Sequence, residues 1–332
     1  MKETRQMALS GVMPARRTAR IKILIAFGAV YIIWGGTYLA IRYAVETIPP
    51  FLTAGCRFII AGAILYGLER ARGAASPSHR HWVSAIILGA LLLVGGSGAL
   101  CWAERRVPSG LAALLSATIP IWMVLLDGKR RGGTKLEGRV IGGMATAMVG
   151  MALLVGPAHM WGSARIDLAG AGLVLASAFS WSLGSVILYR LKMPRSPFLG
   201  AAMEMVSGGV LLLLLGVLMG EPKQLYLREI AARSVWGIAY LVLSSLIGFS
   251  AYIWLLRFVS TARVSTYAFV NPAVAVVAGW LVGGELLSAR ELLATVTIVA
   301  GVALIITHRP TPVAVSLDTE GLPREDPKNG CE

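Results

Sequence analysis

The sequence PFLTAGCR at residues 50–57 returns as PFLGAAME at residues 197–204, an offset of 147 residues. Each copy opens a long apolar run, which indicates an internal duplication of membrane-spanning segments. At this offset Arg57 aligns with Glu204. A basic residue in one copy and an acidic residue in the other, both within apolar spans, is typical of a polar pathway between two related halves of a membrane protein. The duplication therefore predicts a transporter.

The composition places the chain in a bilayer. Hydrophobic residues make up 56% of the 332 residues and charged residues only 14%, with a mean hydropathy of +0.70, whereas soluble domains carry about 25% charged residues. The net charge of +14 lies in short basic runs between apolar stretches, which are typical of topology signals and do not indicate nucleic-acid binding. The three cysteines lack the spacing of a metal site or a disulfide framework, and we expect no cofactor.

Apolar runs of about 20 residues predict an all-α integral membrane protein with ten transmembrane helices. The first run could be a cleaved signal peptide, but it is too long and lacks a small-x-small cleavage site. The ten predicted spans cover approximately residues 23–41, 50–68, 82–103, 107–126, 140–157, 168–189, 197–219, 234–256, 259–282 and 292–307.

The basic residues predict the orientation. Most of the 31 Lys and Arg residues fall in segments on the same side as the N-terminus, so both termini are expected to be cytoplasmic. Because five helices per copy is an odd number, the second copy is expected to be inverted relative to the first. The predicted units are a basic N-terminus (1–22), a first five-helix repeat (23–157), a second (166–307), and a disordered, proline-containing tail (308–332).

Several short motifs occur in an order that resembles a known family: Trp34-Gly35-Gly36-Thr37, Gly55-Cys56-Arg57-Phe58, Glu104-Arg105-Arg106 and Asn271-Pro272. Over about residues 25 to 307 the chain resembles the EamA-type exporters of the drug/metabolite transporter (DMT) superfamily. The resemblance implies two EamA repeats and a central cavity lined by the first, third, fourth, sixth, eighth and ninth helices. It also implies export of amino acids, related metabolites or drugs across a bacterial inner membrane.

Two prolines lie inside predicted spans. Pro120 and Pro272 each lack an N–H, which leaves the carbonyls of Ser116 and Ala268 without their helical partners. In lipid such a carbonyl is tolerated only where protein or cavity water satisfies it. Both prolines therefore predict either cavity-lining breaks or simple packing kinks. Asn271, beside Pro272, favours the cavity for the ninth helix.

Trp34 and Trp181, which align at the 147-residue offset, fall near the middle of their spans, away from the interface where tryptophan is common. A buried indole needs an acceptor for its N–H, so the pair predicts an aromatic-walled cavity for a small-molecule substrate. For each hydroxyl alone, a bond to its own helix backbone is the simpler explanation. The polar residues expected around the cavity are Thr37, Tyr38, Ser97, Trp102, Ser185, Ser245, Tyr252, Tyr267 and Asn271.

Arg57 and Glu204 could form a salt bridge, but their spans enter from opposite faces, which would separate them in depth by roughly 10 Å of the 30 Å hydrocarbon core. We expect backbone carbonyls, hydroxyls or cavity water to satisfy each residue separately. The chain has no ATP-binding loop, so Glu204 is the candidate for proton coupling, because a buried carboxyl holds its proton until water reaches it. Glu104 is the alternative, although Arg105 and Arg106 beside it favour a structural role.

Other classes of function stay open. A passive channel or a lipid scramblase is compatible with an inverted repeat. An intramembrane enzyme is disfavoured, because the four histidines fall in loops or at span ends and no His, Cys and Asp residues have ligand spacing. Small residues in the fifth and tenth spans suit either packing within one chain or a dimer face, so the sequence leaves monomer and homodimer undecided.

Overall fold

The computed structural model describes residues 21–103, 105–107, 109–128, 137–155, 167–283 and 288–307. Within these ranges the fold is all helical, as the apolar runs predict. The predicted N-terminal unit up to residue 20, the tail 308–332, Glu104 and the side chain of Tyr38 lie outside the described residues.

Eight helical runs among the described residues are long and apolar enough to cross a membrane. Two other predicted spans, the first and the ninth, consist of shorter pieces: a helix over Ile21–Gly35 followed by α2 (Thr37–Val45), and α14 (Thr261–Val264) followed by α15 (Tyr267–Gly283). The count of ten therefore stays a prediction. The eight runs are Pro50–Ala71, His79–Ala103, Leu111–Gly128, Gly138–Val155, Leu168–Arg190, Pro197–Leu218, Ala232–Phe258 and Ala289–Thr307.

The first half of the chain continues as α3 (Pro50–Ala71), α4 (His79–Leu88), the π-helix η1 (Gly89–Gly98), α5 (Ala99–Ala103), α6 (Ser109–Ser116), α7 (Ile119–Gly128) and α8 (Gly138–Val155). The second half contains α10 (Leu168–Ile187), the short 3₁₀ helices η2 (Leu188–Arg190), η3 (Glu221–Gln224) and η4 (Leu227–Glu229), and α11 (Pro197–Leu218). It also contains α12 (Ala232–Ser244), the π-helix η5 (Ser245–Phe249), α13 (Ser250–Phe258), α14, α15 and α16 (Ala289–Thr307).

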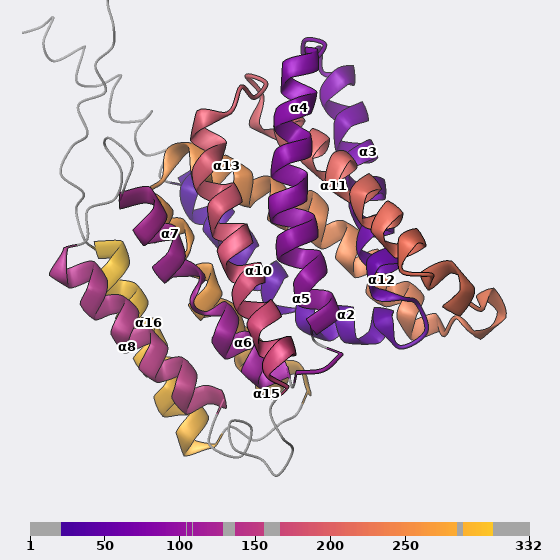
Figure 1. Cartoon of the computed structure of the whole chain (residues 1–332). Helices are drawn as coiled ribbons and strands as arrows, with labels where there is room; N and C mark the ends of the chain where they lie inside the picture. The colour runs from indigo at the N-terminus through magenta and orange to yellow at the C-terminus, as the bar shows by residue number, and fades with distance from the viewer. Residues whose placement is uncertain are drawn as a thin grey trace, which may run out of the picture.

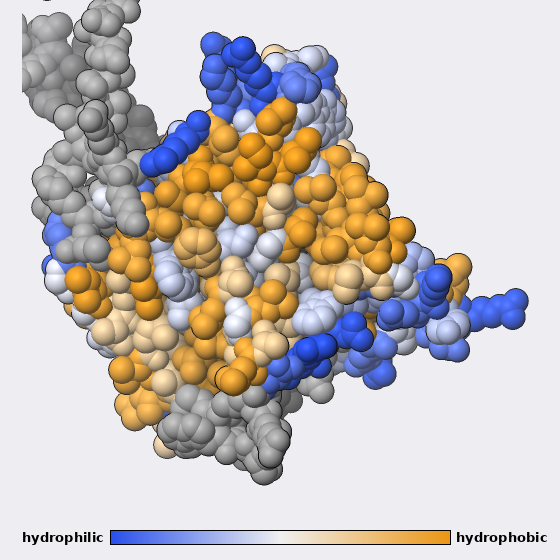
Figure 2. Space-filling model, viewed as in Figure 1, coloured by the Kyte–Doolittle hydropathy of each residue, from blue (hydrophilic) through white to orange (hydrophobic). Residues whose placement is uncertain are grey.

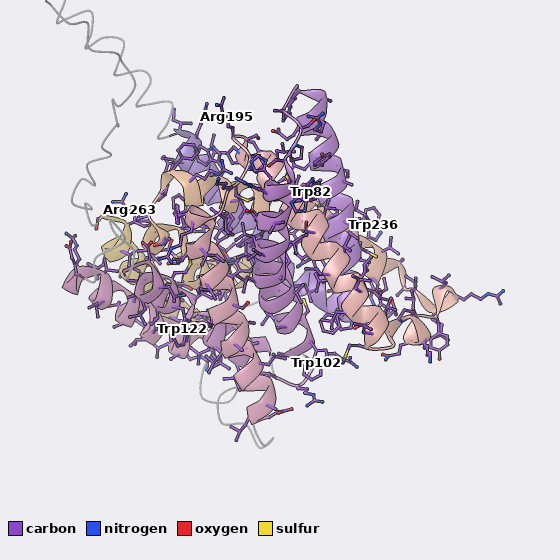
Figure 3. All side chains as sticks on the ribbon, turned by 45° about the horizontal axis from the view of Figure 1, so that its top comes forward. Trp82, Trp102, Trp122, Arg195, Trp236 and Arg263 are labelled. Atoms are coloured by element: carbon purple, nitrogen blue, oxygen red, sulfur yellow. The ribbon has the colours of Figure 1, made fainter. Side chains whose placement is uncertain are left out.

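The surface matches a bilayer environment. Figure 2 shows a broad apolar band across the middle of the visible face, with hydrophilic residues gathered at the top and along the lower right edge. The helical run His79–Ala103 carries Trp82 near its start and Trp102 near its end, and these two side chains lie toward opposite ends of the molecule (Figure 3). Tryptophans in such positions are typical of the two membrane interfaces.

Two helix pairs pack most closely (Figure 1): α3 against α11, and α8 against α16. A Cβ on Gly62 of α3 would lie 2.9 Å from the carbonyl oxygen of Ala202 in α11. A Cβ on Gly143 of α8 would lie 2.7 Å from the carbonyl oxygen of Gly301 in α16. Small residues therefore let these backbones approach closely, as is usual between membrane helices.

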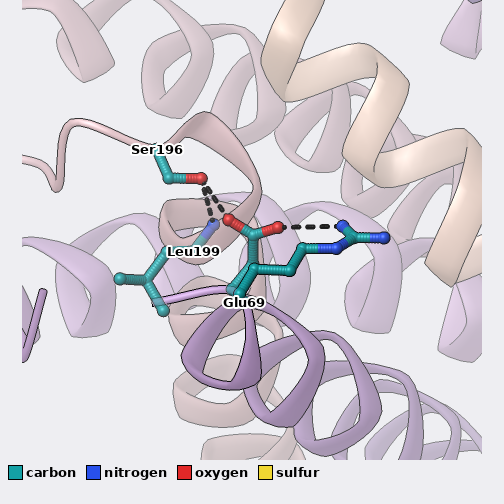
Figure 4. Close-up of polar contacts among 4 residues, drawn as sticks. Glu69, Ser196 and Leu199 are labelled. Carbon is teal, nitrogen blue, oxygen red and sulfur yellow. Dashed lines mark hydrogen bonds and ion pairs between the residues drawn. The ribbon is translucent and has the colours of Figure 1, made fainter. Parts of the chain in front are cut away.

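Buried glutamates join the ends of α3 and α11. Near the end of α3, Glu69 accepts a hydrogen bond of 2.5 Å from the hydroxyl of Ser196, and Ser196 caps α11 by accepting from the backbone N–H of Leu199 (Figure 4). Arg72 pairs with the same carboxylate at 3.2 Å.

At the opposite end of α3, Glu221 caps the helix N-terminus. Its two carboxylate oxygens accept from the backbone N–H groups of Phe51 at 3.1 Å and Leu52 at 2.9 Å. A carboxylate is favourable here because it satisfies unpaired N–H groups and complements the helix dipole. Glu69 and Glu221 thus fix both ends of the α3–α11 pair.

Three helix breaks share the same threonine hydrogen bond. The helix Ile21–Gly35 is separated from α2 at Gly36, α6 from α7 at residues 117–118, and α14 from α15 at residues 265–266. At each break a threonine hydroxyl donates a 2.6 Å hydrogen bond to the carbonyl three residues earlier: Thr37 to Trp34, Thr118 to Leu115 and Thr266 to Arg263. The threonine side chain thereby adds a local hydrogen bond to a carbonyl beside each break.

Candidate functional site: a central aromatic cavity

A cavity of about 130 Å³ lies among the helices. Its wall combines residues from both halves of the chain, supplied by the first helix, α2, α3, η1, α5 to α7, α10, α12, η5 and α15. Of the residues that the sequence analysis placed at a substrate site, those in this wall are Trp34, Thr37, Ser97, Trp181, Ser245, Tyr267 and Asn271, and Arg57, which it gave only as an intramembrane charge, lines the wall as well.

The π-helices make room for the two tryptophans. Gly96 of η1 touches Trp181, because a Cβ on this glycine would lie 2.8 Å from Trp181 Cε3. Gly248 of η5 faces Trp34 in the same way, and a Cβ there would collide with Trp34 Nε1. Each tryptophan therefore packs on a glycine in the other half of the chain. Irregular π segments often occur at functional sites.

The proline-containing segments also reach the cavity. The helix α6 ends at Ser116, just before Pro120 in α7, and Ser116 lines the cavity. Its hydroxyl is buried and has no hydrogen-bond partner among the described residues. Pro272 lies inside α15, and Ala268, four residues earlier, also lines the cavity. The two prolines are not themselves in the wall; they shape the backbone that forms it.

Asn271 is held at the cavity by backbone groups. With its amide oriented to suit its neighbours, the nitrogen donates to the carbonyl oxygens of Tyr31 at 3.3 Å and Tyr267 at 3.1 Å. The hydroxyl of Tyr31 bonds to Thr266 at 2.6 Å, next to the break between α14 and α15. These bonds connect the first helix to the ninth predicted span beside the cavity.

Four aromatic rings form a cluster along one side of the cavity. The ring centroid of Trp34 lies 5.8 Å from Trp181, 5.3 Å from Tyr252 and 5.0 Å from Tyr267. The Tyr252 hydroxyl accepts from the Trp181 indole at 2.9 Å and bonds to Ser185 at 2.5 Å. Tyr252 and Ser185 are fully buried and lie behind the wall, so their contribution is to hold Trp181.

Arg57 brings a positive charge to the cavity. It is 6% exposed, and its Nη2 donates a 2.7 Å hydrogen bond to the hydroxyl of Ser97. Its guanidinium lies 4.3 Å from the ring centroid of Phe58, which also lines the cavity. Local aromatic and hydroxyl contacts thus stabilise the arginine.

Glu204 is placed differently. It is 0% exposed, it lies outside the cavity wall, and neither carboxylate oxygen has a hydrogen-bond partner among the described residues. Among the described residues, Arg257 acts on it electrostatically, and the Nη1 of Arg257 donates to the carbonyl oxygens of Pro194 at 3.1 Å and Arg195 at 3.0 Å. The described residues thus contain no direct bond between Arg57 and Glu204.

The remaining sequence candidates have local roles. Trp102 lies outside the cavity wall, with the Arg106 guanidinium 4.6 Å from its ring centroid. Within the wall, Ser245 donates to Leu241 in the same helical run, and Thr37 donates to Trp34 across the break at Gly36. Both hydroxyls therefore bond to nearby backbone, as the simpler explanation for single hydroxyls anticipates. Sequence reasoning did not select the wall residues Phe58, Ser116, Ser177, Ser244 and Phe249, although the proline rule had already marked the carbonyl of Ser116.

The described residues of the cavity wall include no His, Cys, Asp or Glu. No group of three or more His, Cys, Asp and Glu side chains within the described ranges could hold a metal ion. The part of the wall that the structure describes offers aromatic faces, hydroxyls and one cation, an arrangement suited to binding a solute.

The model of the EamA-like transporter family matches residues 20–156 and again residues 168–307. The chain is 38% identical over 285 residues to the uncharacterized inner membrane transporter YedA of Escherichia coli (strain K12), covering 84% of this chain and 89% of that protein. It is 25% identical to the uncharacterized transporter YoaV of Bacillus subtilis (strain 168), covering 85% and 96%.

A probable amino-acid metabolite efflux pump of Escherichia coli (strain K12) is 23% identical to this chain, with coverage of 82% of this chain and 90% of the pump. A solved crystal structure that is 21% identical superposes with a TM-score of 0.72, covering 86% of this chain and 98% of its own, and shows the same fold. The chain belongs to the EamA-like transporter family, within the drug/metabolite transporter superfamily that its sequence resembles.

Proposed function

We propose that the protein is a secondary transporter that exports small metabolites, such as amino acids or related hydrophobic compounds, across the bacterial inner membrane by alternating access. The observation that carries this proposal is the central cavity, closed along one side by the aromatic cluster of Trp34, Trp181, Tyr252 and Tyr267. The printed names of the relatives, an inner membrane transporter and a probable amino-acid metabolite efflux pump, agree with it. This function requires a small-molecule substrate and a lipid bilayer, and neither nucleic acid nor a cofactor.

Paired contacts support two inverted five-helix repeats. Gly55 of α3 meets Gly209 of α11, while Gly62 meets Ala202. At the 147-residue offset Gly55 aligns with Ala202 and Gly62 with Gly209, so each contact is the counterpart of the other. Two contacts that change places when the two halves are exchanged are what a two-fold axis requires. The double match of the family model, at 20–156 and 168–307, agrees with the same plan.

Two hydrogen bonds between the halves of the chain support a position for the closed side of the cavity. The 2.8 Å bond from Thr261 to Asp127 joins the start of α14 to the end of α7, and the 2.6 Å bond from Tyr31 to Thr266 lies deeper, beside the cavity. With both termini cytoplasmic, as the basic residues predict, the closed side would face the cytoplasm and the cavity would face outward. Transport would then require the cluster to part while the outer half closes.

Counterflow in proteoliposomes tests this function. Vesicles preloaded with one unlabelled metabolite should transiently accumulate the labelled form above its external concentration, because a carrier exchanges one substrate molecule for another. Solute equilibration without such an overshoot would indicate a channel, and movement of labelled lipid between leaflets without solute flux would indicate a scramblase. Either result would contradict the proposal.

We also propose Glu204 as the site of proton coupling. The supporting observation is its fully buried carboxyl, whose oxygens lack hydrogen-bond partners among the described residues. Such a group favours its neutral form until the surroundings hydrate. An acid that only stabilises packing between helices is the alternative.

Flux under an imposed pH gradient distinguishes these roles. Wild-type export should follow the gradient, whereas Glu204→Gln, which keeps the shape of the neutral acid, should transport without responding to it. The matched control is Glu46→Gln, because Glu46 pairs with Arg233 away from the central cavity and its loss should leave coupling unchanged. A Glu204→Gln variant that follows the gradient as the wild type does would rule out this site.

A further inference from the structure

The cavity is electrically asymmetric. Among the described residues that line it, Arg57 is charged and none is acidic. The guanidinium stays protonated under all ordinary conditions. Charges act more strongly where water is scarce, so a nearly buried cation in the wall favours an anionic solute group and disfavours a cationic one.

Hydroxyl donors accompany this charge. The Ser97 hydroxyl accepts from Arg57, and no bond that uses its own hydrogen is found among the described residues. The buried Ser116 hydroxyl in the same wall likewise has no partner there. A carboxylate accepts hydrogen bonds and donates none, so it complements a guanidinium and neighbouring hydroxyls. Hydrogen bonds of this charge-assisted kind are stronger than those between neutral groups.

The rest of the wall suits an apolar body. Trp34, Trp181 and Phe249 present aromatic surface, with Phe249 lying 6.3 Å from Trp181 between ring centroids. The cavity volume of about 130 Å³ is close to that of apolar cavities that hold a benzene molecule, about 150 Å³. The space therefore fits a small aromatic or branched aliphatic group.

We infer that the transported solute carries a carboxylate, bound at Arg57 and Ser97, with a small apolar or aromatic body against the tryptophans. This inference rests on the proposed transport function and narrows its substrate class. Amino acids and other small organic acids satisfy it, whereas cationic drugs without an acidic group do not. Arg57 becomes a specificity-determining residue for charge.

A matched ligand series tests the inference on the wild-type protein. The probes are 3-phenylpropionate, its neutral amide 3-phenylpropanamide, and 2-phenylethylammonium, with binding measured as the concentration dependence of thermal stabilisation. The carboxylate should bind roughly 10- to 100-fold more tightly than the amide, as expected for a hydrogen bond to a charged group, and the ammonium should bind most weakly. Equal binding, preference for the ammonium, or no binding by any probe would overturn the inference.

Substitutions then locate the preference. Arg57→Gln should make the carboxylate and the amide bind equally, and Arg57→Lys should restore part of the preference because it keeps the charge without the planar fork. Arg233→Gln is the charge-matched control, since Arg233 pairs with Glu46 outside the cavity, and it should behave as the wild type. An Arg57→Gln protein that folds and still prefers the carboxylate would overturn the assignment to Arg57.

Counterflow separates the two proposals. Metabolite exchange without any carboxylate preference would leave the transport function standing and remove only the charge class. A carboxylate preference in binding without counterflow for any solute would contradict the transport function and leave the anion-binding site standing, because the cavity would then bind anions without carrying them.

Discussion

Replacing Gly62 by alanine should weaken the α3–α11 pair, whereas the same change at Gly67 in the same helix should not. A Cβ on Gly62 would lie 2.9 Å from the carbonyl oxygen of Ala202 and 2.9 Å from both the backbone nitrogen and Cγ2 of Val206. Two of these three atoms belong to the backbone of α11, so a side-chain rotation cannot relieve the contact. Gly67 is exposed and a Cβ there would meet nothing within 4 Å.

The comparison isolates the packing cost. Both substitutions replace glycine within a helix, which favours the folded state by up to about 1 kcal/mol. At Gly62 this gain is opposed by overpacking, which costs about 1–3 kcal/mol. We therefore expect Gly67→Ala to be neutral or stabilising and Gly62→Ala to be less stable than Gly67→Ala by about 1–3 kcal/mol.

Thermal unfolding of the purified variants in one detergent measures the difference. For a chain of 332 residues the expected gap corresponds to melting temperatures about 1–4 °C apart, because the unfolding entropy is about 2.1 cal/mol/K per residue. Ala202→Gly in the Gly62→Ala background should leave the gap in place, because the obstructing atom of Ala202 is its backbone oxygen. Equal melting temperatures for Gly62→Ala and Gly67→Ala would refute close backbone contact at this seam.

Three other predictions concern the cavity, the helix caps and the topology. Trp34→Ala and Trp181→Ala should lower substrate affinity in binding assays while the protein still folds; failure of both to fold would make these residues packing core, where truncation costs about 3–5 kcal/mol. Glu221→Ala should lower the free energy of unfolding by about 1–3 kcal/mol, because two hydrogen bonds to a charged group are lost. Glu46→Ala, which removes the ion pair with Arg233 at the surface, should lower it by less than about 1 kcal/mol. A C-terminal reporter active only in the periplasm should stay silent, and activity would contradict cytoplasmic termini.

Long, uninterrupted helices were predictable because their signals are local. The spans predicted at 50–68 and 197–219 correspond to α3 (Pro50–Ala71) and α11 (Pro197–Leu218). In each helix proline occupies the first turn, where its missing N–H costs nothing and its fixed φ suits a helix start. Apolar length then carries the helix across the predicted core.

The breaks were harder to predict because tertiary contacts stabilise them. Pro120 and the glycine pair Gly35-Gly36 are local signals of an interruption, but the break at Gly36 is also supported by a tertiary contact, in which the Tyr240 hydroxyl donates a 2.8 Å bond to the carbonyl of Ile33. That partner lies in α12, far along the chain. The π-helices η1 and η5 also meet distant residues, because Gly96 lies against Trp181 and Gly248 against Trp34, and hydropathy is insensitive to such a change in helical winding.

The cavity wall was also hard to predict, because it too depends on tertiary structure. Position within a span selected Trp34 and Trp181, since depth follows from helix rise. Whether a side chain faces the cavity or lies behind it depends on helix rotation, which an almost uniformly apolar helix does not reveal. Tyr252 therefore looked like a wall residue although it supports Trp181 from behind, and Ser116 was noticed only for its carbonyl.

The distribution of helix breaks suggests which helices stay rigid during transport and which ones move. The pairs α3–α11 and α8–α16 consist of uninterrupted helices with close glycine contacts, and such packing resists sliding because a shift of a few tenths of an ångström brings backbone atoms together. Apart from α10 and from Arg57 and Phe58 of α3, the described wall residues come from helices interrupted by a break, a π segment or an internal proline. Hinges that absorb large backbone changes occur at such helix ends.

We therefore expect motion between two access states to concentrate at Gly36, at residues 117–118 and 265–266, and in η1 and η5. Cysteine pairs across the α3–α11 seam should keep one spacing in both states, whereas a pair joining Tyr31 to Thr266 should lock transport.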